Sequence, residues 1–175
     1  MITLTPFAER HFATLLCWFR TEADLVQWAG PDVRFPLDAA QLQAMCDESR
    51  GERPRRDLWM ASQGDAVFGH AQLAYEWRHG VARIARFCIA PEWRGKGLAT
   101  PLLRQVIAEG FAHPEISRVE LNVYTFNAAA IRTYENAGFI REGIRRQAVR
   151  VGDERWDTAM FGLLRDEHKK HVTSS

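Results

Sequence analysis

The residues with the clearest chemical potential form the glycine-rich run Arg94-Gly95-Lys96-Gly97-Leu98-Ala99. This run directly follows the apolar segment Phe87-Cys88-Ile89-Ala90-Pro91, which has the composition of a strand stopped by a proline. Residues 98–111 predict a helix, whose first backbone N–H groups and positive dipole end face the glycine turn. Such a turn binds anions, so the first functional prediction is a phosphate-bearing ligand.

Two common phosphate-binding motifs do not fit this run. A nucleoside-triphosphate loop needs a glycine where this chain has Ala90, and a Ser or Thr where it has Gly97. A dinucleotide fingerprint needs Gly or Ala at the position of Thr100. It also needs an acid near the end of the next strand, whereas Glu120 lies near the start. For the glycines alone, a tight strand–helix connection without any ligand remains an equal alternative.

A second block with fixed spacing lies downstream. Leu121-Asn122-Val123 reads as part of a strand, and Asn127 is followed seven residues later by Tyr134 and then by Gly138-Phe139. Together with Arg94-x-x-Gly97-x-Ala99, this block resembles the two signature motifs of the GCN5-related N-acetyltransferases (the GNAT superfamily). The two motifs are specific in combination, although neither is specific alone.

The end of the chain carries a finer resemblance. Glu142-Gly143-Ile144-Arg145 and Asp157-x-x-Met160 are similar to the family branch that acetylates ribosomal-protein N-termini and various small amines (RimJ/RimL-like). The resemblance covers residues 58–164 well, whereas residues 1–57 match it loosely.

The resemblance implies that acetyl-coenzyme A is the co-substrate. The amides of the glycine turn would cradle its pyrophosphate, and its pantetheine arm would pair with the strand before the turn. A backbone N–H there, that of Ile89 or a neighbour, would polarise the thioester carbonyl. The expected cofactor-binding residues are Cys88, Ile89, Ala90, Arg94, Gly95, Lys96, Gly97, Leu98, Ala99, Thr100 and Asn127.

The resemblance gives Tyr134 the catalytic role of protonating the departing thiolate. Without that context, an aromatic residue on an amphipathic helix is more often part of the core. Asn127 has two roles open to it, because Asn before an alanine run is also a good helix cap.

The general base stays open. Asn122 stands where the branch has a Glu base, and an amide cannot accept the proton. Glu120 shares a strand face with Asn122, and Glu76 or His70 are further candidates through water. A site without a fixed carboxylate base favours an acceptor amine that is already partly neutral. An α-amine has a pKa of about 7.7–8.0. A lysine side chain has a pKa near 10.4, so about 3 to 4 kcal/mol of proton affinity must be overcome before it can react.

The acceptor is expected to contact the N-terminal helices and neighbouring loops. Of Trp18, Trp28, Trp59 and Trp77, we expect one or two to line the acceptor pocket and the rest to be core. Glu22, Asp24 and Asp32 are candidates for steering a cationic amine, with solvated surface as their more common role.

Composition excludes several other classes. The net charge of +1 gives no global field that suggests nucleic acid or an anionic membrane as a partner. No leader segment, membrane span or metal-ligand cluster is recognisable, so we expect a cytoplasmic protein without a metal, as a monomer or homodimer. The odd set of Cys17, Cys46 and Cys88 in apolar contexts indicates reduced packing residues.

The chain predicts one α/β (mixed α+β) domain over residues 1–175, with a central, mostly antiparallel twisted sheet and helices on both faces. Acceptor-side helices would occupy 1–57, the cofactor-binding core 58–164 and a tail 165–175. Expected strands include 2–4, 58–61, 66–75, 81–90, 119–124, one from 139 and 156–164. Expected helices are one containing Phe12 to Phe19, one capped by Asp38, 98–111 and 127–137. Residues 51–57 read as a loop.

The leading functional hypothesis is an N-acetyltransferase acting on a primary amine, either a protein N-terminal α-amine or a small amine or amino acid. The alternative is a non-catalytic acyl-coenzyme A-binding regulatory module. The presence of Tyr134 is evidence against this alternative, and the absence of a Glu at position 122 is evidence for it. Nucleic-acid or ribosome binding is a third hypothesis, although we expect neither a membrane nor nucleic acid as a direct partner. It would use an arginine-rich segment whose usual role is a solvated strand face: Arg141, Arg145, Arg146, Arg150 and Arg155.

Overall fold

A single seven-stranded sheet runs through the part of the chain that the computed structural model describes, residues 1–173. Its strands stand in the spatial order β1-β2-β3-β4-β5-β7-β6. Every neighbouring pair is antiparallel except β4 and β5, which are parallel. The strands are β1 (Ile2–Pro6), β2 (Arg56–Gln63), β3 (Ala66–Glu76), β4 (Val81–Ile89), β5 (Arg118–Tyr124), β6 (Ile140–Val151) and β7 (Glu154–Leu164).

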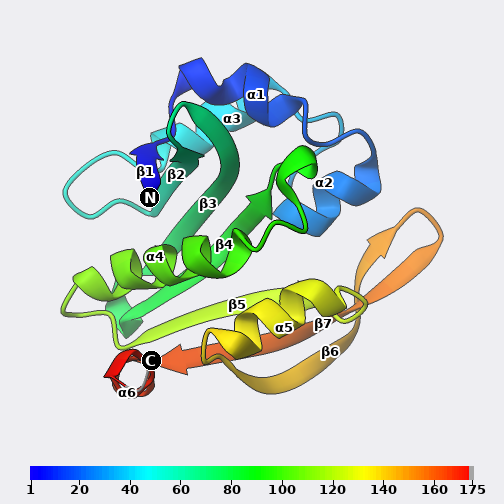
Figure 1. Ribbon diagram of the computed structural model, residues 1–175. Helices are drawn as coiled ribbons and strands as arrows, with labels where there is room; N and C mark the ends of the chain where they lie inside the picture. Colours follow the sequence, from blue (N-terminus) through cyan, green and yellow to red (C-terminus); the bar gives the residue numbers. More distant parts are fainter. Residues whose placement is uncertain (174–175) are drawn as a thin grey trace.

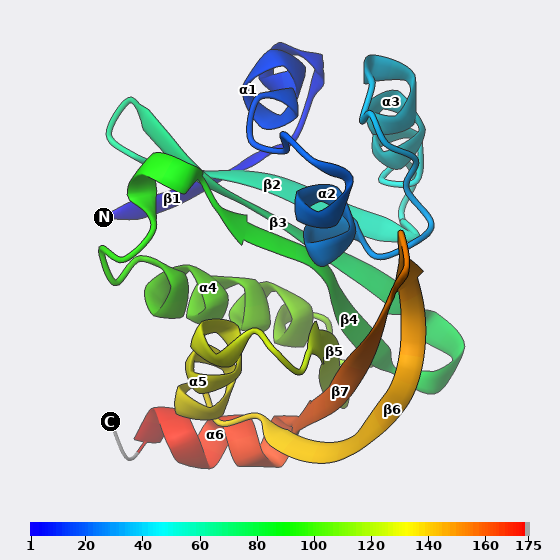
Figure 2. The same ribbon diagram turned by 90° about the vertical axis from the view of Figure 1, so that its right-hand side faces the viewer.

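Helices cover both faces of this sheet, as the sequence predicts (Figure 1). Figure 2 shows α1, α2 and α3 on one face, with α4 and α5 on the other. The helices are α1 (Phe12–Leu16), α2 (Glu22–Ala29), α3 (Ala39–Asp47), α4 (Ala99–Ala112), α5 (Ala128–Asn136) and α6 (Arg165–Thr173). Short 3-10 turns span Glu9–His11, Trp77–His79 and Pro91–Trp93.

Each covered face has its own apolar core. The core under α4 and α5 includes Leu102, Ile107 and Phe161, all of them fully buried. The core under α1, α2 and α3 is built around residues such as Leu25 and Leu42. Because strand side chains alternate between faces, β2, β3 and β4 contribute residues to both cores. The sheet is therefore a wall between two compartments, one per face.

Side-chain caps fix the helix starts that the sequence predicts. The Asp38 carboxylate accepts a hydrogen bond from the Gln41 N–H at 2.8 Å, so α3 begins one residue later. The Asn127 side chain accepts from the Ala130 N–H at 3.2 Å and starts α5. Gly138, at φ +95°, ends that helix in a conformation that favours glycine.

The N-terminal third departs from the sequence expectations. The first helix ends at Leu16, so Phe19 lies outside it, and α2 (Glu22–Ala29) is a helix that we did not predict. Strand β2 begins at Arg56, two residues before the expected start of the strand at Leu58. Cys17 is exposed, which makes the packing role expected for it wrong. It is the C-cap residue of α1, directly after the last helical residue. Residues after Leu164 form α6 as far as Thr173.

The feature that shapes the site is a fork between β4 and β5. The two parallel strands pair only from Val81 to Ile84, opposite Arg118 to Leu121. Beyond Ile84, β4 continues along β3 as far as Ile89, while β5 continues along β7. One edge of β4 over residues 85–89 is therefore left without a strand partner among the described residues.

Candidate active site

The unpaired edge of β4 presents backbone groups to the fork. The Ala90 N–H donates to the Phe68 carbonyl on β3 at 2.8 Å, so the groups of Ala90 point toward β3. In an antiparallel pair these groups alternate in direction along the strand. The N–H and C=O of Ile89 and Phe87 therefore point the other way, into the fork. Arg94 confirms this direction, because its Nε donates to the Ile89 carbonyl at 3.2 Å.

A cavity of about 1000 Å³ occupies the fork and extends toward α2 and the β6–β7 hairpin. Its walls come from parts of the chain that are distant in sequence. They include α2, β4, the glycine turn, the start of α4, the end of β5, α5 and the middle of β6. This volume is in the range of sites that hold a small-molecule ligand.

The glycine turn forms one end of this cavity. Gly95 and Gly97 have φ angles of +74° and +75°, and a Cβ on either would meet nothing within 4 Å. Leu98 caps α4 without a side-chain hydrogen bond, and the first turn of α4 contains no acidic residue. Within the described chain, the N–H groups of residues 95–98 have no acceptor. These free donors, with the helix dipole behind them, have the arrangement that an anion-binding turn requires, and phosphate binding there stays a prediction.

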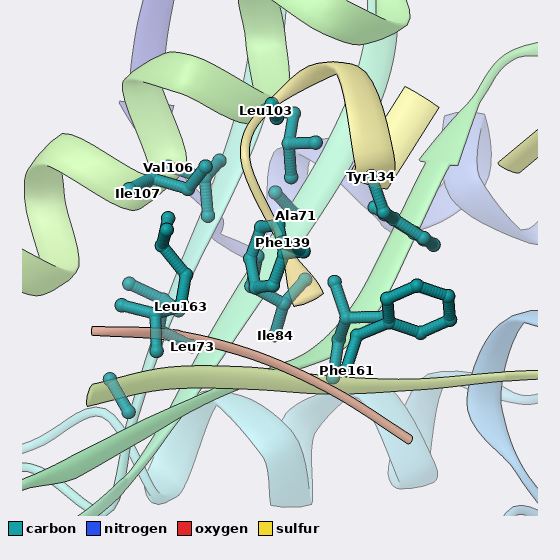
Figure 3. Close-up of a cluster of buried hydrophobic side chains, with 14 of the residues drawn as sticks. Ala71, Leu73, Ile84, Leu103, Val106, Ile107, Tyr134, Phe139, Phe161 and Leu163 are labelled. Carbon is teal, nitrogen blue, oxygen red and sulfur yellow. The ribbon is translucent and has the colours of Figure 1, made fainter. Parts of the chain in front are cut away.

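Tyr134 lines the cavity from α5 while its ring packs into the first core. Figure 3 shows it at one edge of that cluster, with Phe139 and Phe161 nearby. Burial raises the pKa of the phenol to about 12, with a smaller contribution from Cys88. Among the described residues, no group forms a hydrogen bond with the Tyr134 hydroxyl. Tyr134 is thus a neutral O–H donor with no partner, at a cavity wall.

The fold brings most of the predicted site residues around this one cavity. Ala90 and Lys96 do not line it, because Ala90 is fully buried and the Lys96 ammonium lies 4.4 Å from the centroid of the Trp93 ring. The predicted residues that do line it are Cys88, Ile89, Arg94, Gly95, Gly97, Leu98, Ala99, Thr100, Asn127 and Tyr134. Asn127 caps α5 through its side-chain oxygen, which leaves its NH₂ group free to face the cavity.

The candidate general bases lie outside the cavity lining. Glu120 accepts hydrogen bonds from Arg83 and Arg118 at 2.9 and 3.0 Å. Burial raises the pKa of Glu120, but these two guanidinium groups outweigh burial and lower it, which makes Glu120 a weak base. His70 is fully buried, and Glu76 ends β3 away from the cavity. Asn122 does line the cavity.

The acceptor-side wall contains expected and unexpected residues. Of the four tryptophans that we considered, Trp28 lines the cavity. Asp24 and Asp32 are the two carboxylates in the cavity lining among the described residues. Arg86, in the middle of β4, was missed by the sequence reasoning. The available signal was one of the two arginines of a largely apolar strand, at the spacing that shares a face with Cys88.

Neither a membrane span nor a metal cluster appears in the described structure. No helix there is long and apolar enough to cross a bilayer. No group of three or more His, Cys, Asp or Glu side chains in residues 1–173 is arranged to hold a metal ion.

Comparisons with known proteins agree with this geometry. Residues 22–139 match the model of the acetyltransferase (GNAT) family. The chain is 32% identical to the L-amino acid N-acetyltransferase of Escherichia coli K12, over 62% of this chain and 69% of that protein. It is 26% identical to the aminoglycoside N(6')-acetyltransferase type 1 of Klebsiella pneumoniae, over 81% and 75%. The fold is that of spermidine N-acetyltransferase from Vibrio cholerae, solved with CoA and spermine, with a TM-score of 0.82 at 18% identity over 96% and 98% of the two chains.

Proposed function

The chain belongs to the GNAT family of acetyltransferases and is an acetyl-CoA-dependent N-acetyltransferase, and we propose that its reaction takes place in the cavity of the β4–β5 fork. The residues of the free β4 edge, Gly95, Gly97 and Leu98 of the glycine turn, and Tyr134 all line this one cavity. That convergence is the observation on which the proposal rests.

The residues present fit acetyl-CoA. The free N–H groups of residues 95–98 suit a pyrophosphate, and the open space above Gly95 and Gly97 permits its close approach. The strandless edge of β4 can pair with an extended amide-bearing arm, because its outward N–H and C=O groups alternate like those of a sheet edge. The Asn127 NH₂ group adds a donor on the opposite wall.

Acetyl-CoA bound there supplies a thioester, from which the acetyl group passes to the amine and the coenzyme leaves as a thiol. We assign the Ile89 N–H the role of donor to the carbonyl oxygen as negative charge develops on it. We assign the Tyr134 hydroxyl the role of proton donor to the departing sulfur. Its high pKa keeps this proton in place at neutral pH. The attacking neutral amine loses a proton to solvent and the Tyr134 phenolate takes one back from solvent, so the overall proton count balances.

We propose an α-amine as the acceptor, either of an amino acid or of a peptide N-terminus, as in the RimJ/RimL-like branch. No Glu stands at position 122, and Glu120 is held by two arginines. An acceptor with a low amine pKa needs less help from a base than a lysine side chain does. In this proposal residues 1–57 shape the acceptor side and 58–164 hold the cofactor. The enzyme would work in the cytoplasm as a monomer or homodimer.

Acetyl transfer to a panel of amines tests the proposal, with coenzyme A release as the measurement. The panel contains free L-amino acids, a neutral peptide with a free N-terminus, the same peptide blocked at its N-terminus but carrying lysine, and spermidine. We expect α-amines to be acetylated fastest at equal concentration. Faster acetylation of the lysine side chain or of spermidine would contradict the α-amine assignment. Tight acetyl-CoA binding with no turnover on any amine would favour the non-catalytic binding module instead.

A further inference from the structure

A buried polar cluster with excess positive charge lies on the acceptor side of the sheet. Arg86 Nη1 and Arg56 Nη1 both donate to the Gln72 side-chain oxygen, at 2.8 and 3.3 Å. The Gln72 NH₂ group lies 2.9 Å from His70 Nε2. The only ion pair in the cluster joins Arg56 to Glu48 at 2.8 Å. Of the two guanidinium groups, only that of Arg56 is paired with a carboxylate.

Arg86 is the unpaired cation of this cluster. It makes no ion pair in the described structure, and its Nε is buried without a hydrogen-bond partner. Its guanidinium carbon lies 5.8 Å from the Trp28 ring centroid. Burial lowers the pKa of Arg86 to about 10, with Arg56 as the next cause, so it stays charged at neutral pH. A buried cation with unsatisfied donors is costly, and an anion that pairs with it removes that cost.

The position of Arg86 points this charge at the acceptor rather than at the coenzyme. Cys88 packs against the second core and Ala90 is part of it, the core that lies beneath α1–α3. By alternation along the strand, and by its contact with Trp28, Arg86 lies on that same face. Asp32 also lines the cavity and interacts with Arg86 through charge, but no ion pair joins them.

We propose that the acetyl acceptor is an amine that also carries a carboxylate, as a small amino acid does, and that Arg86 binds this carboxylate. The inference rests on the acetyl-transfer function proposed above. A carboxylate would accept charge-assisted hydrogen bonds from Nη2 of the guanidinium, because Nη1 is bonded to Gln72 and Nε is buried. The same positive charge disfavours a bound ammonium, so the amine beside it enters the reaction more readily as the neutral form.

The spacing along β4 agrees with an acceptor of this size. Arg86 precedes Ile89, the proposed donor to the thioester carbonyl, by three residues, or about 10 Å of strand. The arginine side chain covers part of that length and a small amino acid covers the rest. A polyamine has no anionic group that Arg86 could bind. It would also bring positive charge to a cavity wall where positive charge already exceeds negative charge.

The test compares each of two amino acids with its own carboxamide in the wild-type enzyme: L-alanine with L-alaninamide, and L-phenylalanine with L-phenylalaninamide. Amidation removes the negative charge and lowers the pKa of the amine, so intrinsic reactivity favours the amides. We expect kcat/KM to be roughly 10- to 100-fold higher for the acids, the range for a charged hydrogen-bonded pair. Equal or faster acetylation of the amides overturns the proposal without relying on any variant.

Arg86→Gln supplies the second arm, with Arg83→Gln as the matched control. Arg83 lies on the same strand and also lines the cavity, but it is paired with Glu120. Arg86→Gln should lower kcat/KM for the acids to the level of the amides and leave acetyl-CoA affinity unchanged, and Arg83→Gln should keep the preference for acids.

Three outcomes would count against Arg86 as the carboxylate-binding residue. They are an equal loss for acids and amides, a loss of acetyl-CoA binding, and an equal loss of preference in Arg83→Gln. A wild-type enzyme that binds acetyl-CoA but acetylates nothing would instead refute the proposed function itself, so the two failures are distinguishable.

Discussion

At the scale of single residues, burial decides the protonation of two side chains, Tyr134 in the cavity lining and His70 behind it. The Tyr134 phenol is held neutral, which suits a proton donor. His70 is also held neutral, because burial lowers its pKa to about 3, with Arg86 as the next cause. His70 Nε2 faces the Gln72 NH₂ group and must accept, so the ring proton sits on Nδ1. His70 therefore has a structural role: it accepts a hydrogen bond from Gln72, the residue that Arg86 contacts.

This burial of a neutral histidine predicts a pH dependence of stability. Below pH 6.5 the unfolded chain binds a proton at His70 and the folded chain does not, so acid favours unfolding. The contribution of His70 is intact above pH 6.5 and falls by about 1.4 kcal/mol for each unit as pH drops toward 3. The measurement is the free energy of unfolding in urea from pH 8 to pH 4.5.

The control for this prediction is His70→Gln, which keeps a polar partner for Gln72 but does not titrate. Carboxylates titrate in both proteins, so the difference between their two pH slopes isolates His70. We expect a shallower slope in the variant, whatever its stability at pH 8. Identical slopes would show that His70 does not enter the folded protein in its neutral form.

At the scale of elements, the glycine turn works because of its backbone. Gly97 has a positive φ, lines the cavity and has free space where a Cβ would be. Gly64, in the β2–β3 hairpin, also has a positive φ (+60°) and free space where a Cβ would be, but it does not line the cavity. An alanine in either place pays the penalty of a left-handed conformation, about 1 kcal/mol.

Gly97→Ala should therefore weaken acetyl-CoA binding, while Gly64→Ala should only reduce stability. We expect the dissociation constant of acetyl-CoA to rise by roughly fivefold or more in Gly97→Ala, because the amides that we propose as phosphate donors would be displaced. Calorimetric titration measures this constant, and thermal unfolding should show similar losses in both variants. Unchanged binding in Gly97→Ala would place the phosphates elsewhere.

The sequence predicted those elements whose signals are local. The Asp38 and Asn127 caps, the Gly138 stop and the glycine turn each act within a few residues, and the structure has all of them. Helix α2 was missed because its apolar stretch is only two turns long, although Thr21 and Asp24 form a capping box at its start.

The acceptor wall could not be predicted in the same way. Gln72 and Arg86 stand opposite each other only because β3 and β4 pair in one register, next to a bulge. Arg56 and Glu48 join the cluster from β2 and from the residue after α3. No sequence pattern gives that register or that charge balance, since both depend on which strands become neighbours.

At the scale of the whole molecule, the fork between β4 and β5 joins the two compartments of the sheet. Figure 2 shows the N-terminal helices on one face and α4 with α5 on the other. Trp28 and Arg86 line the cavity from the face covered by the N-terminal helices. The glycine turn and Tyr134 line it from the face covered by α4 and α5. An acceptor and a thioester can thus approach each other from opposite faces through a gap in the sheet. The single parallel pair, which ends at Ile84, creates that gap.

The measurement that tests this account most directly is coenzyme A release by Tyr134→Phe at saturating acetyl-CoA and amine. Tyr75→Phe is the control, since its hydroxyl donates to Asp57 outside the cavity lining. We predict that kcat falls by about 100-fold or more in Tyr134→Phe, while the acetyl-CoA dissociation constant stays within about twofold. Tyr75→Phe should retain wild-type turnover. Wild-type turnover by Tyr134→Phe would contradict the assigned role of this hydroxyl and the placement of the leaving thiol beside it.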